Sequence, residues 1–130
     1  MATLPLGRLG GVPVNLCTAL AGNVSTTNIA QRTPMDRPLF ATILRLVSAA
    51  GSACTYLIEG SPDATIWNPL PWIDLASGAN AATSQVCGTF AETGAVTRFK
   101  LIPVDIPWIY VRVTMSANTA MTNTWDVWSY

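Results

Sequence analysis

The chain has 130 residues, half of them apolar, and its seven basic and seven acidic residues make up only 11%. Soluble domains carry about 25% charged residues on average, so much of this surface must be neutral or apolar, as in a subunit that other molecules cover. The charges cancel and histidine is absent, which disfavours nucleic acid and membrane as partners and removes the commonest general base and metal ligand.

Residues 1–37 differ in composition from the rest, with three prolines, the Gly10-Gly11 pair and a polar stretch at 23–28. We predict an extended N-terminal arm followed by one strand near residues 12–21. The arm's apolar residues are too spread out to form a core, so they pack on a neighbouring molecule, add a strand to its sheet, or fold back as an edge strand. Those expected to bind a partner are Leu4, Leu6, Leu9, Val12 and Val14. The first eleven residues contain no apolar run of signal-peptide length, so we expect synthesis in the cytoplasm.

Residues 39–47 are apolar on both faces except at Arg45 and are bracketed by a proline and a glycine. A run of this length between two breakers is typical of a central strand with both faces buried. A helix is the alternative, since leucine is a good helix former. The longer apolar run at 39–50 is too short to span a membrane and contains Arg45, so we expect no membrane partner.

Residues 53–59 alternate in polarity, and Cys54, Tyr56 and Ile58 share one face. Alternation with a period of two predicts a strand with one face on a core. The residues at 60–63 supply turn chemistry, and residues 65–70 can return as the second strand of a hairpin.

Three more strands are predicted toward the C-terminus by the same alternation. In the first, Phe99 and Leu101 alternate with Arg98 and Lys100. In the second, at 108–115, one face carries Ile109, Val111, Val113 and Met115, and the other carries Trp108, Tyr110, Arg112 and Thr114. In the last, at 121–129, one face carries Trp125 and Val127, and the other carries Thr122, Thr124, Asp126 and Trp128.

Nine prolines and nine glycines leave little room for helices. The runs between them are rich in β-branched and aromatic residues, the composition of an all-β sandwich or barrel. We predict a jelly-roll-like β-sandwich of about eight strands with an extended N-terminal arm. The arm and first strand occupy residues 1–37 and the sandwich residues 38–130, in a single domain overall.

No constellation of reactive side chains specifies an enzyme. The acidic residues are scattered, and nothing in their spacing selects the two facing carboxylates of a glycosidase. Asp63, Asp74 and Asp105 fall in expected loops that could bind calcium, but they lack the repeated spacing of a calcium loop. The three cysteines form no C-x-x-C pair and are expected to be buried free thiols. We therefore predict no catalytic residues, no metal and no cofactor.

Five tryptophans is a high count for a chain of this length. We expect Trp67 and Trp125 to fill the core. Trp72 lies in a proline-rich loop, and Trp108 and Trp128 lie on strand faces opposite the apolar ones. These three are the predicted aromatic anchors of an interface with another protein, or of a platform for sugar rings.

The segment YLIEGSPDATIWNPLPW, at 56–72, resembles a pattern of phage virion proteins in which a strand ends in EGS, a loop follows, and a later strand has the form YVRV. Here that strand is at 109–113, and a small polar turn and the final strand WDVW follow it. The order also resembles that of galactose-binding-like sandwiches. The resemblance covers roughly the chain after residue 40. It implies a β-sandwich capsid decoration (cement) protein that clamps major capsid proteins as a dimer or trimer. The chain departs from the pattern at 62–64, where Pro-Asp-Ala replaces a common Asp-Gly.

We therefore expect a structural virion protein, made in the host cytoplasm, that binds the major capsid protein or other virion subunits as a homodimer or homotrimer. Phage tail and head-to-tail connector subunits are the nearest alternatives, because they are also small and rich in strands. A carbohydrate-binding module is a further alternative, since exposed aromatic side chains stack on sugars. If the arm makes the attachment, removal of residues 1–20 abolishes binding and leaves the sandwich folded.

Overall fold

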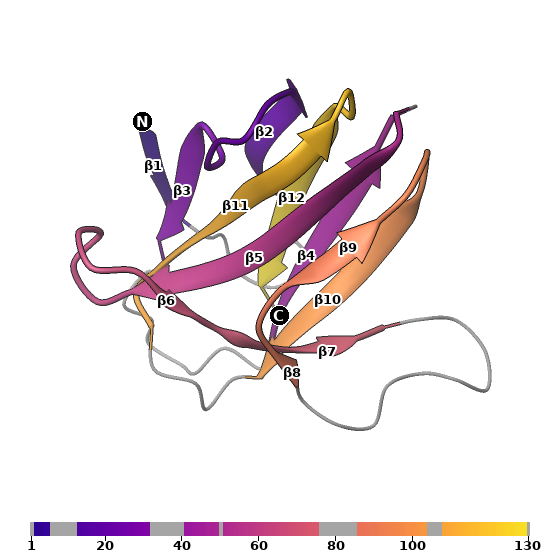
Figure 1. Cartoon of the computed structure of the whole chain (residues 1–130). Helices are drawn as coiled ribbons and strands as arrows, with labels where there is room; N and C mark the ends of the chain where they lie inside the picture. Colours follow the sequence, from indigo (N-terminus) through magenta and orange to yellow (C-terminus); the bar gives the residue numbers. More distant parts are fainter. Residues whose placement is uncertain are drawn as a thin grey trace.

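The computed structural model describes residues 2–5, 13–31, 41–49, 51–75, 86–103 and 108–129. Across these ranges the chain forms twelve strands and no helix, arranged as two packed sheets (Figure 1). The described residues therefore contain no helix that could cross a membrane. The predicted all-β sandwich is confirmed.

The strands are short and follow one another closely along the chain. In order they are β1 (Ala2–Pro5), β2 (Val14–Leu20), β3 (Asn28–Gln31), β4 (Ala41–Ser48), β5 (Ala53–Ser61), β6 (Asn68–Pro69), β7 (Pro71–Asp74), β8 (Val86–Cys87), β9 (Phe90–Glu92), β10 (Thr97–Pro103), β11 (Tyr110–Thr119) and β12 (Asn123–Ser129).

Eight of these strands pair as a jelly roll, in which the first strand pairs with the last, the second with the second-last, and so on inward. The pairs are β2 with β12, β3 with β11, β4 with β10 and β5 with β9, all antiparallel. The predicted jelly-roll-like architecture of about eight strands is thus confirmed. The four remaining strands, β1, β6, β7 and β8, are two to four residues long and lengthen the edges.

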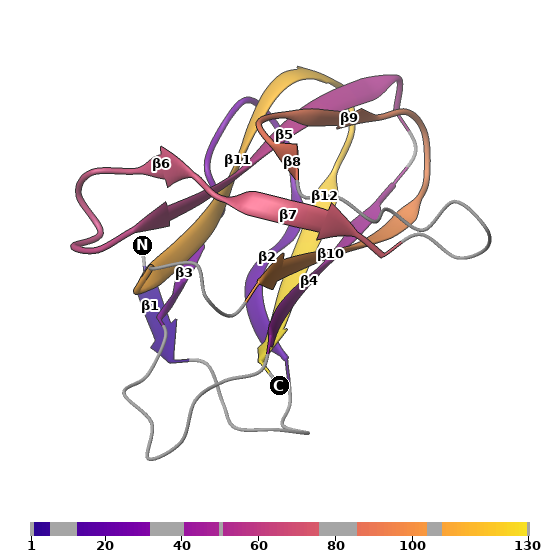
Figure 2. The same ribbon diagram turned by 90° about the horizontal axis from the view of Figure 1, so that it is seen from below.

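The two layers are named here by their central strands. The β5 sheet contains β1, β3, β11 and β5, with β6 and β9 both on the outer edge of β5. The β4 sheet has the order β2-β12-β4-β10-β7-β8. Seen from below, β6 and β7 follow one another from the β5 sheet to the β4 sheet and so join the two layers (Figure 2).

The core lies between the sheets and is organised around aromatic side chains. Tyr56 and Trp125 are fully buried and pack edge to face, with ring centroids 5.6 Å apart. Phe90 lies 5.2 Å from Tyr56 and 5.1 Å from Trp72. The Tyr56 hydroxyl bonds to the side-chain oxygen of Asn123 at 2.5 Å, so its polar end is satisfied inside the core.

Several predicted strands have the expected position and facing. β2 lies within residues 12–21, and β4 lies between β12 and β10, as expected for a central strand. The predicted alternation of β5 is also observed, since Cys54, Tyr56 and Ile58 are all buried. The hairpin after β5 forms too, although its return strand pairs over only two residues.

β10 alternates as predicted, but the side of the strand that faces the core is the one that carries Lys100 and not the one that carries Phe99. Phe99 is 38% exposed, whereas Lys100 and Ile102 are buried. The inward lysine is tolerated because its Nζ lies 3.2 Å from a carboxylate oxygen of Asp74 and 4.5 Å from the centroid of the Trp72 ring. An ammonium that is both ion-paired and stacked on an aromatic face has replaced much of its hydration.

The residues that precede β11 also reverse the prediction. Trp108 is buried, whereas Ile109 is 43% exposed. β11 begins only at Tyr110, so these two residues do not follow the alternation of the strand. From Val111 onward the predicted inward face is correct.

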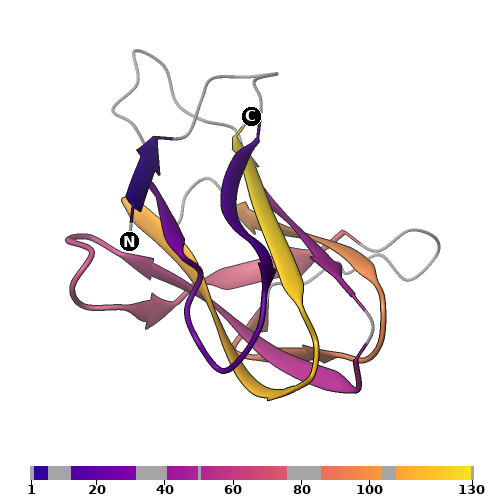
Figure 3. The ribbon, with the colours of Figure 1, turned by 90° about the horizontal axis from the view of Figure 1, so that it is seen from above.

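Residues 2–5 fold back onto their own domain. β1 lies parallel to β3 at the edge of the β5 sheet, with Leu4 opposite Ala30. Figure 3 shows β1 beside β3, and β2 beside β12 in the other sheet. Of the three possibilities for the arm, an intramolecular edge strand is therefore the one observed for this segment.

Candidate interaction surface

The outer face of the β4 sheet carries rows of apolar side chains that run across its strands. Facing residues on antiparallel strands point to the same side of a sheet. The first row crosses β7, β10, β4 and β12 and contains Ile73, Leu101, Ile43 and Trp128. All four are partly exposed, because the buried residues of these strands point the other way, into the core.

A second row lies one step along the same strands. It contains Leu75, Phe99, Arg45, Asp126 and Asn15, which come from five neighbouring segments. A third row contains Thr97, Val47 and Thr124.

We call the seven apolar residues of these rows the apolar face: Ile43, Val47, Ile73, Leu75, Phe99, Leu101 and Trp128. In the described part of the chain, six large apolar side chains are more than a third exposed, and three of them belong to the apolar face. These three are Val47, Leu75 and Phe99, with exposed fractions of 38%, 39% and 38%. A concentration of exposed apolar side chains on one sheet face marks a surface that another molecule covers.

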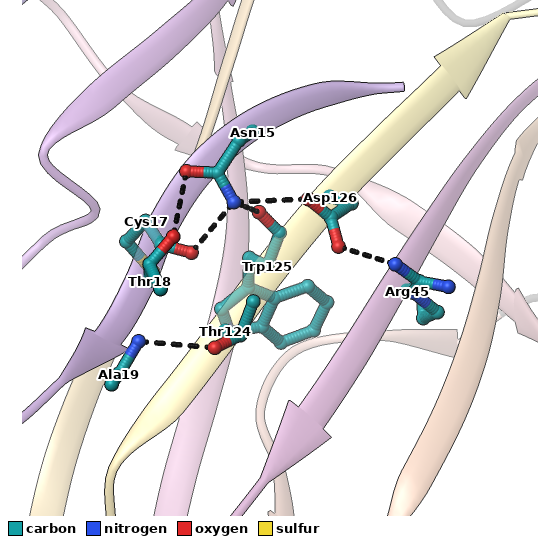
Figure 4. A network of polar contacts seen from close by, with 8 residues as sticks. All are labelled: Asn15, Cys17, Thr18, Ala19, Arg45, Thr124, Trp125 and Asp126. Atoms are coloured by element: carbon teal, nitrogen blue, oxygen red, sulfur yellow. Dashed lines mark hydrogen bonds and ion pairs between the residues drawn. The ribbon is translucent and has the colours of Figure 1, made fainter. Parts of the chain in front are cut away.

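One ion pair lies in the middle of the apolar face. Arg45 Nη2 is 2.8 Å from Asp126 Oδ2 (Figure 4). The Arg45 guanidinium also stacks over the Trp128 ring, with its carbon 4.9 Å from the ring centroid. The other Asp126 oxygen accepts a hydrogen bond from the Asn15 side chain at 2.9 Å. Asn15 is itself held by the Cys17 carbonyl, which accepts from it at 3.0 Å. The acidic end of the pair is therefore fixed by β2.

The basic end of the pair is less completely satisfied. Arg45 Nε is buried and has no hydrogen-bond acceptor among the described residues. A buried N–H without an acceptor costs about 1–3 kcal/mol. The Arg45 side chain as a whole is 35% exposed, so a partner could contact its accessible part but not the buried Nε.

The outer face of the β5 sheet is polar and satisfies its own hydrogen bonds. Glu59 accepts from Arg112 Nε at 3.2 Å and from the Thr114 hydroxyl, and Thr114 bonds to Ser25 at 2.9 Å. The Trp67 ring stacks on Arg112, with the guanidinium carbon 4.2 Å from its centroid. The two outer faces of the sandwich therefore differ in chemistry, and the β4 sheet carries the apolar one.

Charges are neutralised locally across the described residues. All four basic side chains within the described ranges form ion pairs at 2.8 to 3.2 Å. The two most exposed of them are Arg98 and Arg45. The pairs are Arg45 with Asp126, Arg98 with Glu92, Lys100 with Asp74 and Arg112 with Glu59. The described surface therefore presents no basic patch.

Of the three predicted aromatic anchors, only Trp128 lies on the apolar face. Trp72 and Trp108 are buried, so their expected exposure is wrong. Trp72 turns inward with β7, stacks on Phe90, and donates its indole N–H to the Gly88 carbonyl at 3.2 Å. Trp125 fills the core as expected, whereas Trp67 is only half-buried, on the surface over Arg112.

The structure describes two of the five predicted apolar residues of the arm. Leu4 lies in β1, and Val14 lies opposite Val127 and packs against the core rather than facing a partner. Leu6, Leu9 and Val12 lie outside the described residues.

Sequence reasoning missed most of the apolar face. A signal was present, because Ile43 and Val47 alternate with inward leucines along β4, so that strand is apolar on both sides. Such a strand is usual where helices or a second sheet cover both faces. Here the second side is exposed, and only the sheet order brings Phe99 and Leu101 beside it.

Two buried thiols and one buried hydroxyl have raised pKa values, which favour their protonated forms. Burial raises the pKa of the Cys17 thiol to about 11, and it also raises the pKa of Cys54 and of the Tyr56 hydroxyl. The described residues contain no cluster of three or more histidine, cysteine, aspartate or glutamate side chains that could hold a metal. Cys17 and Cys54 are buried free thiols as predicted, whereas Cys87 is exposed.

No family model, no curated protein sequence and no solved structure matches this chain.

Proposed function

We propose that this protein is an adhesive structural subunit of a virion, most specifically a capsid decoration protein that binds and stabilises a lattice of major capsid proteins. The observation that carries the proposal is the apolar face, because a largely uncharged outer sheet surface on a chain with few charges is expected in a subunit that another copy or another virion protein covers. The jelly roll is a recurrent architecture of viral capsid proteins, which supports the same class. It also occurs in lectin domains, so architecture alone does not decide.

The mechanism of such a subunit is burial of apolar surface. Covering apolar area contributes about 25 cal/mol per Å² before the cost of ordering the partners is subtracted. Each contact can be weak, because repetition over a lattice multiplies weak contacts through avidity. No bond is made or broken, and no cofactor takes part.

A carbohydrate-binding module is the second candidate, and Trp128 favours it. Its ring lies on an outer sheet face beside Arg45, Asp126 and Asn15, a group of donors and acceptors next to an aromatic surface. Sugar sites combine stacking with polar groups of this kind. The stacked guanidinium covers part of the ring, which favours the virion proposal. Tail and connector subunits remain alternatives within the virion class.

The decisive experiment is co-sedimentation of the purified chain with capsids assembled from the major capsid protein encoded by the same genome. We expect saturable binding at a fixed ratio to capsid subunits, and no change of tryptophan fluorescence with a panel of oligosaccharides. Absence of the protein from the capsid pellet would refute the decoration role. A saturable fluorescence change with one glycan would favour the second candidate.

The structure shows that the role of the arm must be tested with a shorter deletion than residues 1–20. Removing residues 1–20 would delete β2, which pairs with β12 in the jelly roll. A deletion of residues 1–12 keeps β2 and removes the predicted arm contacts at Leu4, Leu6, Leu9 and Val12. We expect this variant to fold and to bind capsids more weakly. Unchanged binding would exclude the arm as an attachment element.

A further inference from the structure

We propose that a second copy of this chain covers the apolar face, in a face-to-face dimer whose twofold axis runs along the strands between β4 and β12. The inference names a partner for the surface on which the proposed function rests. Attachment to a capsid would then use other surfaces of the dimer.

Charge complementarity is the reason to choose a second copy of the chain as the partner. Arg45 and Asp126 face one another across β4 and β12, so they lie side by side at the same level of the sheet. A twofold axis between these strands turns β12 of one protomer over β4 of the other. It places Arg45 over the partner's Asp126 and Asp126 over the partner's Arg45. A second copy therefore matches both charges, whereas a partner surface of one sign would oppose one of them.

The same axis also brings apolar residues of the first row together. Rotation about an axis along the strands leaves each residue at its own level, so Ile43 lies over the partner's Trp128 and Val47 lies over the partner's Thr124. In the same arrangement β10, which carries Leu101, lies over the partner's β2. Shifting the partner by one level would separate Arg45 from the partner's Asp126 and place it over Thr124 or Trp128, so its charge would lose the opposite charge across the axis.

The remaining hydrogen-bonding capacity of the pair fits this arrangement. The Arg45 side chain is 35% exposed, so part of it can contact a second molecule. An ionised carboxylate has about four acceptor positions on its two oxygens. Among the described residues, Asp126 accepts single hydrogen bonds from Asn15 and Arg45, so the partner's Asp126 retains capacity for a further donor. Two sheets packed face to face with strands about 30° apart bring such side chains into contact.

The polar outer face of the β5 sheet does not offer a comparable interface. Its charged group, Glu59, is already bonded to Arg112 and Thr114. Leu57 lies on this face, is half-buried like Leu101, and occupies a strand that is equally central. It therefore provides a matched control position.

The test is sedimentation velocity of the full chain over a range of concentrations, without capsids. We expect a monomer–dimer equilibrium for the wild type. Leu101→Lys should weaken the dimer by about a hundredfold or more, because it buries an unpaired charge in the interface, whereas Leu57→Lys should leave the dimer intact. A monomer at all concentrations, a trimer, or equal effects of the two substitutions would overturn the inference.

Charge reversal tests the axis itself. R45D or D126R alone should weaken the dimer by about tenfold or more, because each places like charges opposite one another. The double variant R45D/D126R restores both the internal pair and the pairs across the axis, so it should dimerise like the wild type. Thermal melts identify variants that fail to fold, and Leu101→Lys gives an independent reading if a single reversal does. Failure of the double variant to recover while folded would exclude this axis.

The capsid and solution experiments separate the two proposals. A monomer in solution that binds capsids would contradict the dimer and leave the decoration role standing. A dimer that does not bind capsids would contradict the decoration role and leave the dimer standing.

Discussion

Lys100 is buried in the interior with its Nζ 4.5 Å from the ring centroids of both Trp72 and Phe90 and 3.2 Å from Asp74 Oδ1. This contact joins β10 to β7 and β9 and closes one end of the sandwich. It combines an ion pair with two cation–π contacts around one ammonium group. The aromatic residues that the sequence suggested as surface anchors thus include one, Trp72, that stabilises a buried charge.

Removing the carboxylate of this ion pair should cost more than removing the lysine, because the Lys100 side chain is 3% exposed whereas that of Asp74 is 33% exposed and can be hydrated. Asp74→Asn leaves the buried ammonium without its counter-charge, so we expect unfolding in urea to show a loss of about 1–3 kcal/mol. Lys100→Met keeps the volume and removes the charge, and its cost should be under about 1.5 kcal/mol. A larger loss for Lys100→Met than for Asp74→Asn would contradict the argument.

Two tryptophans should differ sharply in their contribution to stability. Trp125 is fully buried against Tyr56, and Trp125→Ala should cost about 3–5 kcal/mol in urea unfolding. Trp67 lies on the surface over Arg112, and Trp67→Ala should cost about 1 kcal/mol or less. Similar losses for the two variants would show that the assignment of core and surface is wrong.

Asp63 makes the free energy of unfolding depend on pH in the acidic range. Its carboxylate accepts backbone hydrogen bonds from Ile66 and Thr65 and one from the Ser61 hydroxyl, which lower its pKa below the usual 3.8. A carboxyl group with a depressed folded pKa stabilises the protein above the unfolded pKa, and this contribution disappears as the pH falls through the folded pKa.

Asp63→Asn removes this titration but keeps the side-chain acceptor. Urea midpoints measured between neutral pH and pH values below 3.8 should therefore fall less steeply for the variant than for the wild type. Parallel curves for the two proteins would show that Asp63 does not contribute.

The three thiols should differ in reactivity. Cys87 is exposed, whereas Cys17 and Cys54 are buried with raised pKa values. Since the thiolate is the reactive form, a chromogenic disulfide reagent at mildly alkaline pH should modify one thiol per native chain quickly and the other two only in denaturant. Cys87→Ser should remove the fast phase, and a fast phase that persists would place one of the other cysteines at the surface.

The predicted exposure of the tryptophan anchors was only partly correct, and the reasons are physical. Trp128 was selected because it lies opposite Trp125 on an alternating strand, and alternation survives folding where a strand is regular. Trp108 and Ile109 precede the strand that they were assigned to, so their facing was reversed. The alternation in β10 separates Phe99 and Leu101 from Arg98 and Lys100, but no local pattern identifies the carboxylate and the rings that allow Lys100 to face inward.

By itself, the sequence determined the class of the fold and the inward faces of β5, of β12 and of β11 from Val111 onward. Frequent proline and glycine exclude helices, and a period of two follows from the geometry of a strand, so both properties are local. The tertiary structure alone decided which strands are neighbours. Pairing β4 with β10 and β12 brings Ile43, Phe99 and Trp128 onto one surface and joins Arg45 to Asp126 across 81 residues of sequence. Such a surface is a property of strand order, which depends on long-range packing rather than on any segment of the chain.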